Sequence, residues 1–282
     1  MTARLVLTIH CPDRPGIVGA VGGLLHGLDC NIVESAQFGD QQTRRFFMRI
    51  VIESPSLGRD GLRGALAPVA GQYGMSVAVR AAADRPRTLI LVSRPGHCLN
   101  DLLYRRDIGD LPVEIVGIVS NHRDWEGLVA ARGLGFHHLP VTPDGRAAAE
   151  RQLSDLAAAT GAELIVLARY MQILSPALCA AFAGRLINIH HSFLPGFKGA
   201  RPYHQAHAHG VKLIGATAHY VTADLDEGPI IEQEVIRVDH AMPPDQLAAA
   251  GRDIENIVLA RAIRWHAESR VLLNGNKTVV FR

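Results

Sequence analysis

The sequence has no long apolar run and little excess of either charge. Its hydrophobic stretches are strand-length, so we expect no membrane-spanning helix. Its first residues lack the long apolar region of a secretory signal. The 29 Lys and Arg residues nearly balance the 27 Asp and Glu residues, which argues against a nucleic-acid-binding surface. These absences predict a soluble cytoplasmic protein. Its length of 282 residues suits two domains or one large one.

Cysteine is scarce, and no complete set of metal ligands is present. The four cysteines are scattered without a Cys-x-x-Cys pair, which predicts reduced thiols: Cys11, Cys30, Cys98 and Cys179. The 14 histidines include the pairs His137-His138 and His190-His191 and the motif His207-x-His209. Because no carboxylate or thiolate joins them at metal-ligand spacing, we expect no metal site.

The first 80 residues predict a self-contained unit. Periodicity indicates the order βαββαβ, which is a ferredoxin-like plan of one sheet and two helices. The predicted elements are Leu5–Ile9, Ile17–Leu28, Asn31–Phe38, Arg45–Ile52, Leu57–Gln72 and Met75–Val79. The Pro-broken, charged stretch Ala81–Arg87 predicts a linker, so we expect a first domain over 1–83 and a second over 84–282.

Two short motifs in this unit resemble those of ACT domains. They are Asp13-Arg14-Pro15-Gly16-Ile17-Val18 and Cys30-Asn31-Ile32. The resemblance implies a homo-oligomer (dimer or tetramer) that binds small amino acids. The free backbone N–H groups before the first helix would bind the carboxylate of the amino acid, and a side-chain amide would bind its amine. The candidate effector residues are Asp13, Arg14, Gly16, Ile17 and Asn31. The alternative, a unit that only dimerises, stays open.

Beyond the linker, near-continuous apolar strands alternate with helices. This alternation predicts a Rossmann-like α/β domain with a mostly parallel, doubly wound sheet. The predicted strands are Thr88–Val92, Val113–Val119, Phe136–Leu139, Glu163–Ala168, Leu186–His190 and Ile214–Val221, with a long helix over Gln246–Glu268 and a short final strand over Lys277–Phe281. Ligands bind at the carboxyl ends of such strands, where Arg169-Tyr170-Met171 and Asn188-Ile189-His190 are expected.

The stretch from Leu186 to Ile231 carries the candidate chemistry. Asn188 and His190 are two residues apart, so they share one face of a strand. Asn can stabilise an oxyanion, His can move a proton, and Asp226 in a later turn can orient the His and hold a water. Asn188-Ile-His190-His191-Ser192-Phe-Leu-Pro195, followed by Leu225-Asp226-Glu227-Gly228-Pro229-Ile230, resembles the folate-dependent formyltransferase and hydrolase superfamily. Without the longer pattern, these residues would read as a polar strand end and a turn.

The resemblance implies catalytic Asn188, His190 and Asp226 around the formyl group of 10-formyltetrahydrofolate, which is the substrate, so that no separate cofactor is expected. His191 is expected on the opposite face of the strand from His190 or in the loop that follows. His219 is expected either to support the site or to be a core histidine. The substrate-binding residues implied are Tyr170, Met171, Ile173, Leu174, His191, Ser192, Thr222, Ala223 and Asp224.

The acceptor of the formyl group separates the branches of this superfamily. The resembling transferases that act on a phosphorylated ribonucleotide carry a Gly-rich phosphate cradle after the first strand, whereas Ser93-Arg94-Pro95-Gly96-His97-Cys98 has Pro and bulky side chains where free backbone amides are needed. The resembling transferases that act on transfer RNA carry a further C-terminal domain, which we do not expect here. The ACT-like unit, His191-Ser192-Phe193 and Gly199-Ala200-Arg201-Pro202-Tyr203 resemble the hydrolase branch, the deformylases, whereas Lys198 is more like a transferase residue. We therefore expect hydrolysis to tetrahydrofolate and formate, with formate supplied for purine synthesis. The alternatives are transfer to a small amine and a non-catalytic sensor of folate or amino acids.

Overall fold

The computed structural model describes residues 2–142, 144–196 and 202–282, which form two compact units. The first unit extends to Asp84 and also includes Glu268–Asn274 and Thr278–Arg282. The second unit comprises Arg85–Ala267 and Gly275–Lys277. The predicted boundary, with 84–282 as one domain, places the whole C-terminal segment in the second unit. The last residues of the chain instead pack on the first unit, a long-range contact that no local sequence pattern indicates.

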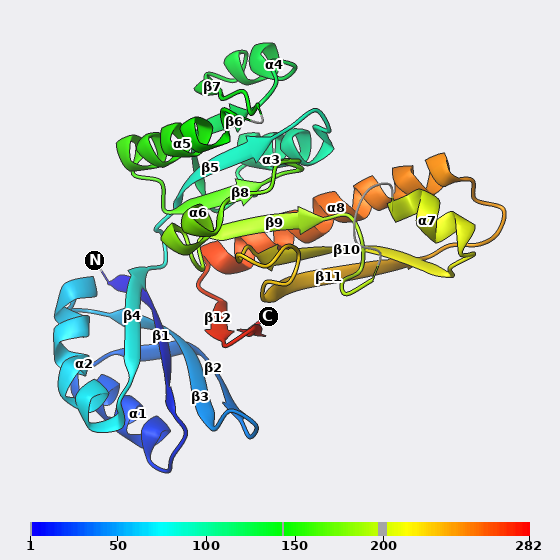
Figure 1. The fold of residues 1–282 in the computed structure, drawn as a ribbon. Coiled ribbons are helices and arrows are strands. Elements are labelled where there is room, and N and C mark those ends of the chain that lie inside the picture. Colours follow the sequence, from blue (N-terminus) through cyan, green and yellow to red (C-terminus); the bar gives the residue numbers. More distant parts are fainter. Residues whose placement is uncertain (1, 143, 197–201) are drawn as a thin grey trace. The chain divides into compact units, whose positions relative to one another are not determined.

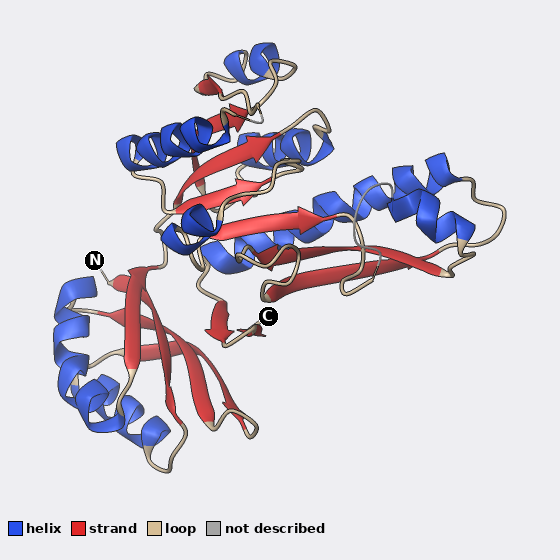
Figure 2. Ribbon diagram, in the orientation of Figure 1, coloured by secondary structure: helices blue, strands red, loops and turns tan. Residues whose placement is uncertain are grey.

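The first unit is an antiparallel sheet with two helices on one face (Figures 1 and 2). Its elements are β1 (Ala3–Pro12), α1 (Ile17–Gly27), β2 (Asn31–Asp40), β3 (Arg45–Ser54), α2 (Arg59–Tyr73) and β4 (Ser76–Ala81). The strand order is β2-β3-β1-β4. Leucine, isoleucine and valine side chains of β1, β3, α1 and α2 form the core between sheet and helices. The predicted ferredoxin-like βαββαβ plan is confirmed.

The other face of this sheet holds the C-terminal hairpin, β12 (Val271–Asn274) and β13 (Lys277–Val280). Side chains alternate along β3, so Phe46 and Met48 enter the helix-covered core while Phe47 lies on the opposite face. There Phe47 packs with Leu272 and Phe281. The hairpin thus covers apolar surface that the sheet would otherwise expose to water.

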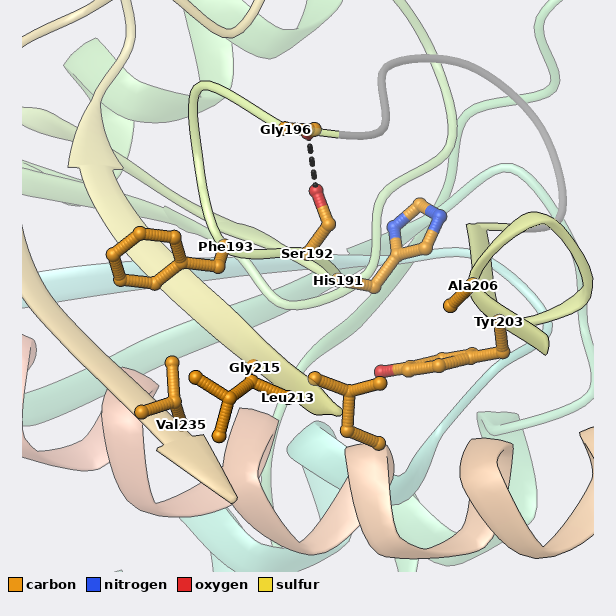
Figure 3. Close-up of a pocket in the computed structure, with 10 residues that line it drawn as sticks. His191, Ser192, Phe193, Gly196, Tyr203, Ala206, Leu213, Gly215 and Val235 are labelled. Carbon is orange, nitrogen blue, oxygen red and sulfur yellow. Dashed lines mark hydrogen bonds between the residues drawn. The ribbon is translucent and has the colours of Figure 1, made fainter. Parts of the chain in front are cut away.

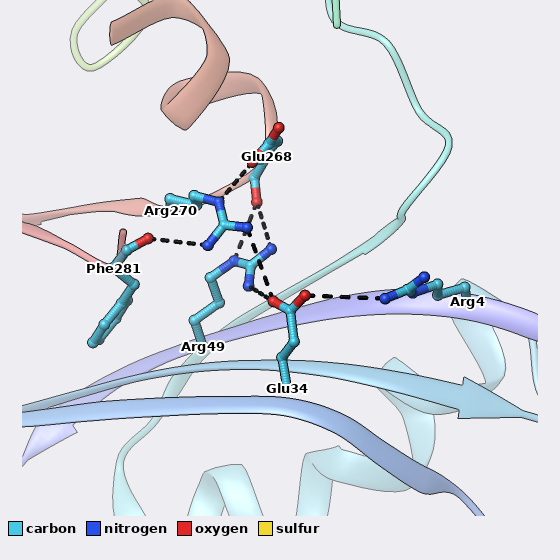
Figure 4. A network of polar contacts seen from close by, with 6 residues as sticks. All are labelled: Arg4, Glu34, Arg49, Glu268, Arg270 and Phe281. Atoms are coloured by element: carbon cyan, nitrogen blue, oxygen red, sulfur yellow. Dashed lines mark hydrogen bonds and ion pairs between the residues drawn. The ribbon is translucent and has the colours of Figure 1, made fainter. Parts of the chain in front are cut away.

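Arg49 joins the hairpin to the sheet by hydrogen bonds (Figure 4). Its side chain is 6% exposed, and its guanidinium donates to the Glu268 carbonyl at 3.2 Å and to the Glu34 carboxylate at 2.9 Å. Arg270 donates to the Glu268 carboxylate at 2.6 Å and to the Phe281 carbonyl at 3.2 Å. Because a buried charge is tolerated only when it is paired and hydrogen-bonded, the hairpin completes the environment of Arg49.

The second unit is a seven-stranded sheet of order β11-β10-β9-β8-β5-β6-β7 with helices on both faces (Figures 1 and 2). Its strands are β5 (Arg87–Val92), β6 (Glu114–Ser120), β7 (Phe136–His138), β8 (Leu164–Leu167), β9 (Leu186–His190), β10 (Leu213–Tyr220) and β11 (Ile230–Arg237). Its helices are α3 (His97–Asp107), α4 (Glu126–Ala130), α5 (Arg146–Thr160), α6 (Pro176–Ala181), α7 (Pro202–Ala208) and α8 (Pro244–Ala267). The five neighbouring strands β9, β8, β5, β6 and β7 are parallel to one another.

Only β10 and β11 run antiparallel to their neighbours, so the predicted mostly parallel α/β sheet is confirmed. Strand β11 is an edge strand whose centre is the polar run Glu232-Gln233-Glu234, and its sequence pattern does not predict it. The four-residue strand β12 is likewise not predicted. Helix α8 packs on β9, β10 and β11 and on α3 and α7. Among the described helices, none has the length and apolar character that a membrane crossing requires.

The Arg49 contacts predict that the Arg49→Ala variant loosens the hairpin. Removal of the Arg49 guanidinium would leave the Glu268 carbonyl without this donor, so we expect the free energy of unfolding to fall by about 2 kcal/mol. Chemical denaturation measures this change, and limited proteolysis should then cleave the C-terminal segment sooner. Arg4→Ala is the matched control, because Arg4 is half exposed and lies 4.0 Å from the same Glu34, and should change stability by less than about 0.5 kcal/mol. Equal effects of the two substitutions would contradict the role of Arg49.

Candidate active site

A cavity of about 570 Å³ lies where β8 and β9 end. One wall is the segment after β8, which contributes Tyr170, Met171, Ile173 and Leu174. Ser93, directly after β5, secures this segment because its hydroxyl accepts from the Met171 N–H at 3.0 Å and its own N–H donates to the Arg169 carbonyl at 3.2 Å. The cavity has the size and mixed lining expected of a small-molecule site.

Asn188, His190 and Asp226 come together in this cavity. Nδ1 of His190 lies 3.2 Å from an Asp226 carboxylate oxygen, and its Nε2 is buried without a hydrogen-bond partner in the described part of the chain. A carboxylate accepts hydrogen bonds, so it holds the proton of His190 on Nδ1. The unpartnered Nε2 is then available to a bound group.

His219 lies opposite Asn188 in the β9–β10 pairing and supports the same site. Its Nδ1 lies 2.9 Å from the Tyr220 carbonyl, which can only accept, so Nδ1 carries a proton. Nε2 of His219 lies 3.2 Å from the Asn188 amide nitrogen and 3.7 Å from an Asp226 carboxylate oxygen. These two contacts orient the Asn188 side chain beside Asp226. Of the two expectations for His219, the geometry favours support of the site.

Asp226 is held in its ionised form. Burial by itself raises the pKa of this carboxyl group, but hydrogen bonds and charge interactions from His190 and His219 outweigh burial and hold the pKa well below its usual value. The residue has a left-handed φ of 57° in the turn between β10 and β11. Such a backbone is uncommon for a non-glycine residue and is often found at functional sites.

Comparison with known proteins supplies the family. The formyl transferase family model matches residues 86–263, and the ACT domain model matches residues 5–59. A Corynebacterium sp. (strain P-1) protein named formyltetrahydrofolate deformylase is 51% identical over 99% of this chain and 98% of its own. A crystal structure of formyltetrahydrofolate deformylase from Burkholderia mallei has 55% identity, a TM-score of 0.95 and covers 99% of this chain and 100% of its own. The chain belongs to the formyltetrahydrofolate deformylase family.

A more distant structure has a different acceptor in its name. The crystal structure of glycinamide ribonucleotide transformylase 1 from Symbiobacterium toebii is 32% identical, with a TM-score of 0.65 over 70% of this chain and 95% of its own. In the present deformylase-family chain, the Trp125 ring packs on Gly96 so closely that a Cβ there would collide with it. The Gly96 segment at the start of α3 is therefore covered by an indole ring and is not an open phosphate cradle.

The predicted substrate residues of this deformylase-family chain are divided between two pockets. Thr222 and Ala223 line the main cavity with the four residues after β8, whereas Asp224 is not among its lining residues. Ser192 lines a neighbouring apolar pocket of about 300 Å³, where its hydroxyl donates to the Gly196 carbonyl at 3.1 Å (Figure 3). His191 lines both pockets. Lys198 and the rest of residues 197–201 lie outside the described residues.

Two further groups near the cavity were not predicted, Tyr203 and Glu255. Tyr203 lines the cavity, and its hydroxyl donates to the Glu255 carboxylate at 2.8 Å. Glu255 is 1% exposed and lies among the buried residues of α8. A sequence signal was present, because Glu255 follows Leu247 and Gly251 at four-residue intervals on the apolar face of the helix.

In the first unit, the predicted effector residues have different surroundings. Gly16 has a left-handed φ of 95° at the start of α1, and Asn31 is exposed, 3.5 Å from the Glu53 carboxylate. The Arg14 guanidinium stacks on the Tyr73 ring at 4.4 Å, and the Asp13 N–H donates to the Arg44 carbonyl. Ile17 is 2% exposed and belongs to the core. Its side chain therefore packs inside the unit, and only its backbone is left for a ligand.

His191 predicts an acid-dependent loss of stability. It follows the end of β9, with its ring 5.1 Å from that of His190. Burial, and then the charges of Arg169 and His190, lower the pKa of His191 to about 4. The unfolded chain then binds more protons than the folded one between this value and the ordinary pKa near 6.5, so folding weakens as pH falls through that window. From pH 7 to pH 4, we expect wild-type unfolding free energy to fall by on the order of 2 kcal/mol more than that of His191→Gln. Parallel pH profiles in chemical denaturation would contradict this.

Proposed function

We propose that this enzyme hydrolyses 10-formyltetrahydrofolate to tetrahydrofolate and formate, and that it does so in the cytoplasm. The observation that carries the proposal is His190, whose Nδ1 faces Asp226 and whose buried Nε2 has no partner among the described residues, beside Asn188 in one cavity. The formate would serve purine synthesis, and no separate cofactor enters the reaction. The experiment is the measurement of formate release from 10-formyltetrahydrofolate with no amine acceptor added.

The proposed mechanism assigns one task to each polar group. The Asp226 carboxylate holds the attacking water and stabilises the positive charge of protonated His190. Asn188 and His190 donate to the oxygen that becomes negative when water adds to the formyl carbon. The carbon–nitrogen bond then breaks as the leaving nitrogen takes the Nε2 proton of His190, while Asp226 accepts the proton that the attacking water loses. Release of that proton from Asp226 to solvent and uptake of a proton from solvent by Nε2 of His190 restore the site. The lowered pKa of Asp226 favours its action as a hydrogen-bond acceptor and charge partner over lasting protonation.

The apolar wall after β8 suits the pterin ring of the substrate. Met171 and Ile173 are both more than half exposed although they line the cavity, so apolar surface is available to a flat ring. We propose that Tyr170, Leu174, Thr222 and Ala223 complete this contact, and that His191 lies near the formyl group. Ser192 and Asp224 would act indirectly, because the cavity does not reach them.

The division of labour predicts unequal losses on substitution. Asp226→Asn keeps the side-chain shape but removes its charge, and should lower kcat by about 10²-fold or more with little change in folate binding. Asn188→Ala removes an oxyanion donor and should raise the barrier by ~3 kcal/mol. His190→Ala should be at least as damaging, because it removes a donor and the proton carrier. Steady-state formate release measures the activity of all three variants, and full activity in Asp226→Asn would contradict the proposed mechanism.

His191→Gln is the matched control for His190. His191 stays neutral and is adjacent in sequence, but it has no carboxylate partner in the proposed mechanism, so its substitution should lower kcat less than that of His190. Losses of equal size would mean that His191 shares the work of holding water.

We propose further that the first unit joins copies of the chain and binds a small amino acid. β2 is an edge strand of its sheet and exposes Ile32, Val33 and Phe38, a surface that suits pairing with another copy. The backbone at Gly16 and the amide of Asn31 suit the two ends of an amino acid. We expect glycine or methionine to change activity in the wild type, and the response to weaken in Asn31→Ala. Activity and light scattering with and without each amino acid test this, and a monomer that ignores both would contradict it.

A further inference from the structure

Glu255 anchors a buried cluster behind one wall of the cavity. One of its carboxylate oxygens accepts from the Tyr203 hydroxyl at 2.8 Å. The other lies 2.7 Å from Nε2 of His97 and 3.4 Å from Nε of Arg169. Burial raises the pKa of Glu255, but the His97 hydrogen bond and the Arg169 charge outweigh burial, so the pKa is lowered and the group is a carboxylate at neutral pH. Both of its oxygens already have partners.

Arg169 is held in this cluster by an unfavourable backbone. Its φ of 64° is left-handed, which costs a non-glycine residue on the order of 1 kcal/mol. Its side chain is 12% exposed, and Nε is close enough to Glu255 for an ion pair but lacks a well-aligned hydrogen bond. A costly backbone at a cavity wall indicates that the position of this side chain serves function more than stability.

The cluster and the proposed catalytic residues share one cavity. Arg169, Tyr203 and His191 line it together with His190 and Asp226. α8 permits the close approach of Tyr203 because Gly251 has no side chain, and a Cβ there would collide with the Tyr203 hydroxyl. Tyr203 and Arg169 thus stand between Glu255 and the space in which the formyl group would react.

This arrangement discriminates between two nucleophiles that could attack the formyl carbon, a primary amine and water. A primary amine enters largely as an ammonium ion and needs a carboxylate to hold it and remove its proton. Of the described residues that line the cavity, Asp226 is the only acidic one, and it is paired with His190 and holds the attacking water in the proposed mechanism, so no second carboxylate in the cavity binds an ammonium ion. The Glu255 carboxylate is already paired with Tyr203, His97 and Arg169. The permanent positive charge of Arg169 also repels an ammonium ion. Water is neutral and small, so neither feature excludes it.

We propose that Arg169, paired with Glu255, is the specificity-determining residue that reserves the formyl group for water and excludes amine acceptors. The proposal rests on the proposed hydrolysis of 10-formyltetrahydrofolate. It assigns no chemical step to Arg169, which acts by occupying Glu255 and by its charge. With Arg169 removed, the Glu255 carboxylate would become available to an amine, which would then attack the formyl carbon and release tetrahydrofolate and a formamide.

The test compares products from 10-formyltetrahydrofolate with glycinamide as the amine probe. Formate and N-formylglycinamide are quantified by mass spectrometry, and their ratio is independent of total turnover. Wild type should yield formate alone. Arg169→Gly, in which glycine adopts the left-handed backbone freely, should raise the share of formylated amine by roughly tenfold or more, since one charge at close range changes an interaction by at least that much. Arg169→Lys keeps the positive charge, so its ratio of formate to N-formylglycinamide should resemble that of wild type.

A double variant separates charge from space. Arg169→Gly combined with Glu255→Gln opens the same volume without the carboxylate, and should return the product ratio to that of wild type. If Arg169→Gly fails to fold, Arg169→Gln removes the charge while it keeps a polar side chain, and the same rise is expected. An unchanged ratio in a folded, formate-releasing Arg169 variant would overturn the proposal. A wild type that releases no formate would instead contradict the proposed function.

Discussion

The contact between Asp226 and His190 is the interaction on which the candidate active site depends. It joins a turn to a strand that ends 36 residues earlier, and β10 makes this possible by running antiparallel to β9. The turn returns close to β10, where Gly228 lies so near the Tyr220 carbonyl that a Cβ would collide with it. The Asp226 carboxylate therefore reaches His190 only because the backbone beyond it carries no side chain at this point.

Buried charge recurs in both units, and in each case the partners come from distant parts of the chain. Arg49 has partners on β2 and beside the C-terminal hairpin. Glu255 has partners on α7, on α3 and after β8. Such clusters contribute little net stability, because desolvation offsets most of the attraction between the charges. Their value is geometric, since a buried charge accepts few arrangements of its neighbours.

The cavity also explains why a fold shared with a transformylase can accommodate a different acceptor. The wall after β8 offers apolar surface, which a pterin ring needs whatever the acceptor is. Trp125 covers Gly96 at the start of α3, and Arg169 is paired with Glu255. Under the proposed function, differences in a few side chains around one cavity would be sufficient to change the nucleophile, because the two folds are similar.

Local sequence determined the two α/β units, their core faces and the residues Asn188, His190 and Asp226, because strand alternation, helical spacing and a long ordered motif are all recorded in short stretches. The edge strand β11 escaped prediction because its polar centre gives a weak pattern. The return of the C-terminal hairpin to the first unit, the contacts of His219 with Asn188 and Asp226, and the pairing of Arg169 with Glu255 were decided only by tertiary structure. Each depends on which distant groups meet away from water, where an unpaired charge or donor is costly, and no local periodicity carries that information.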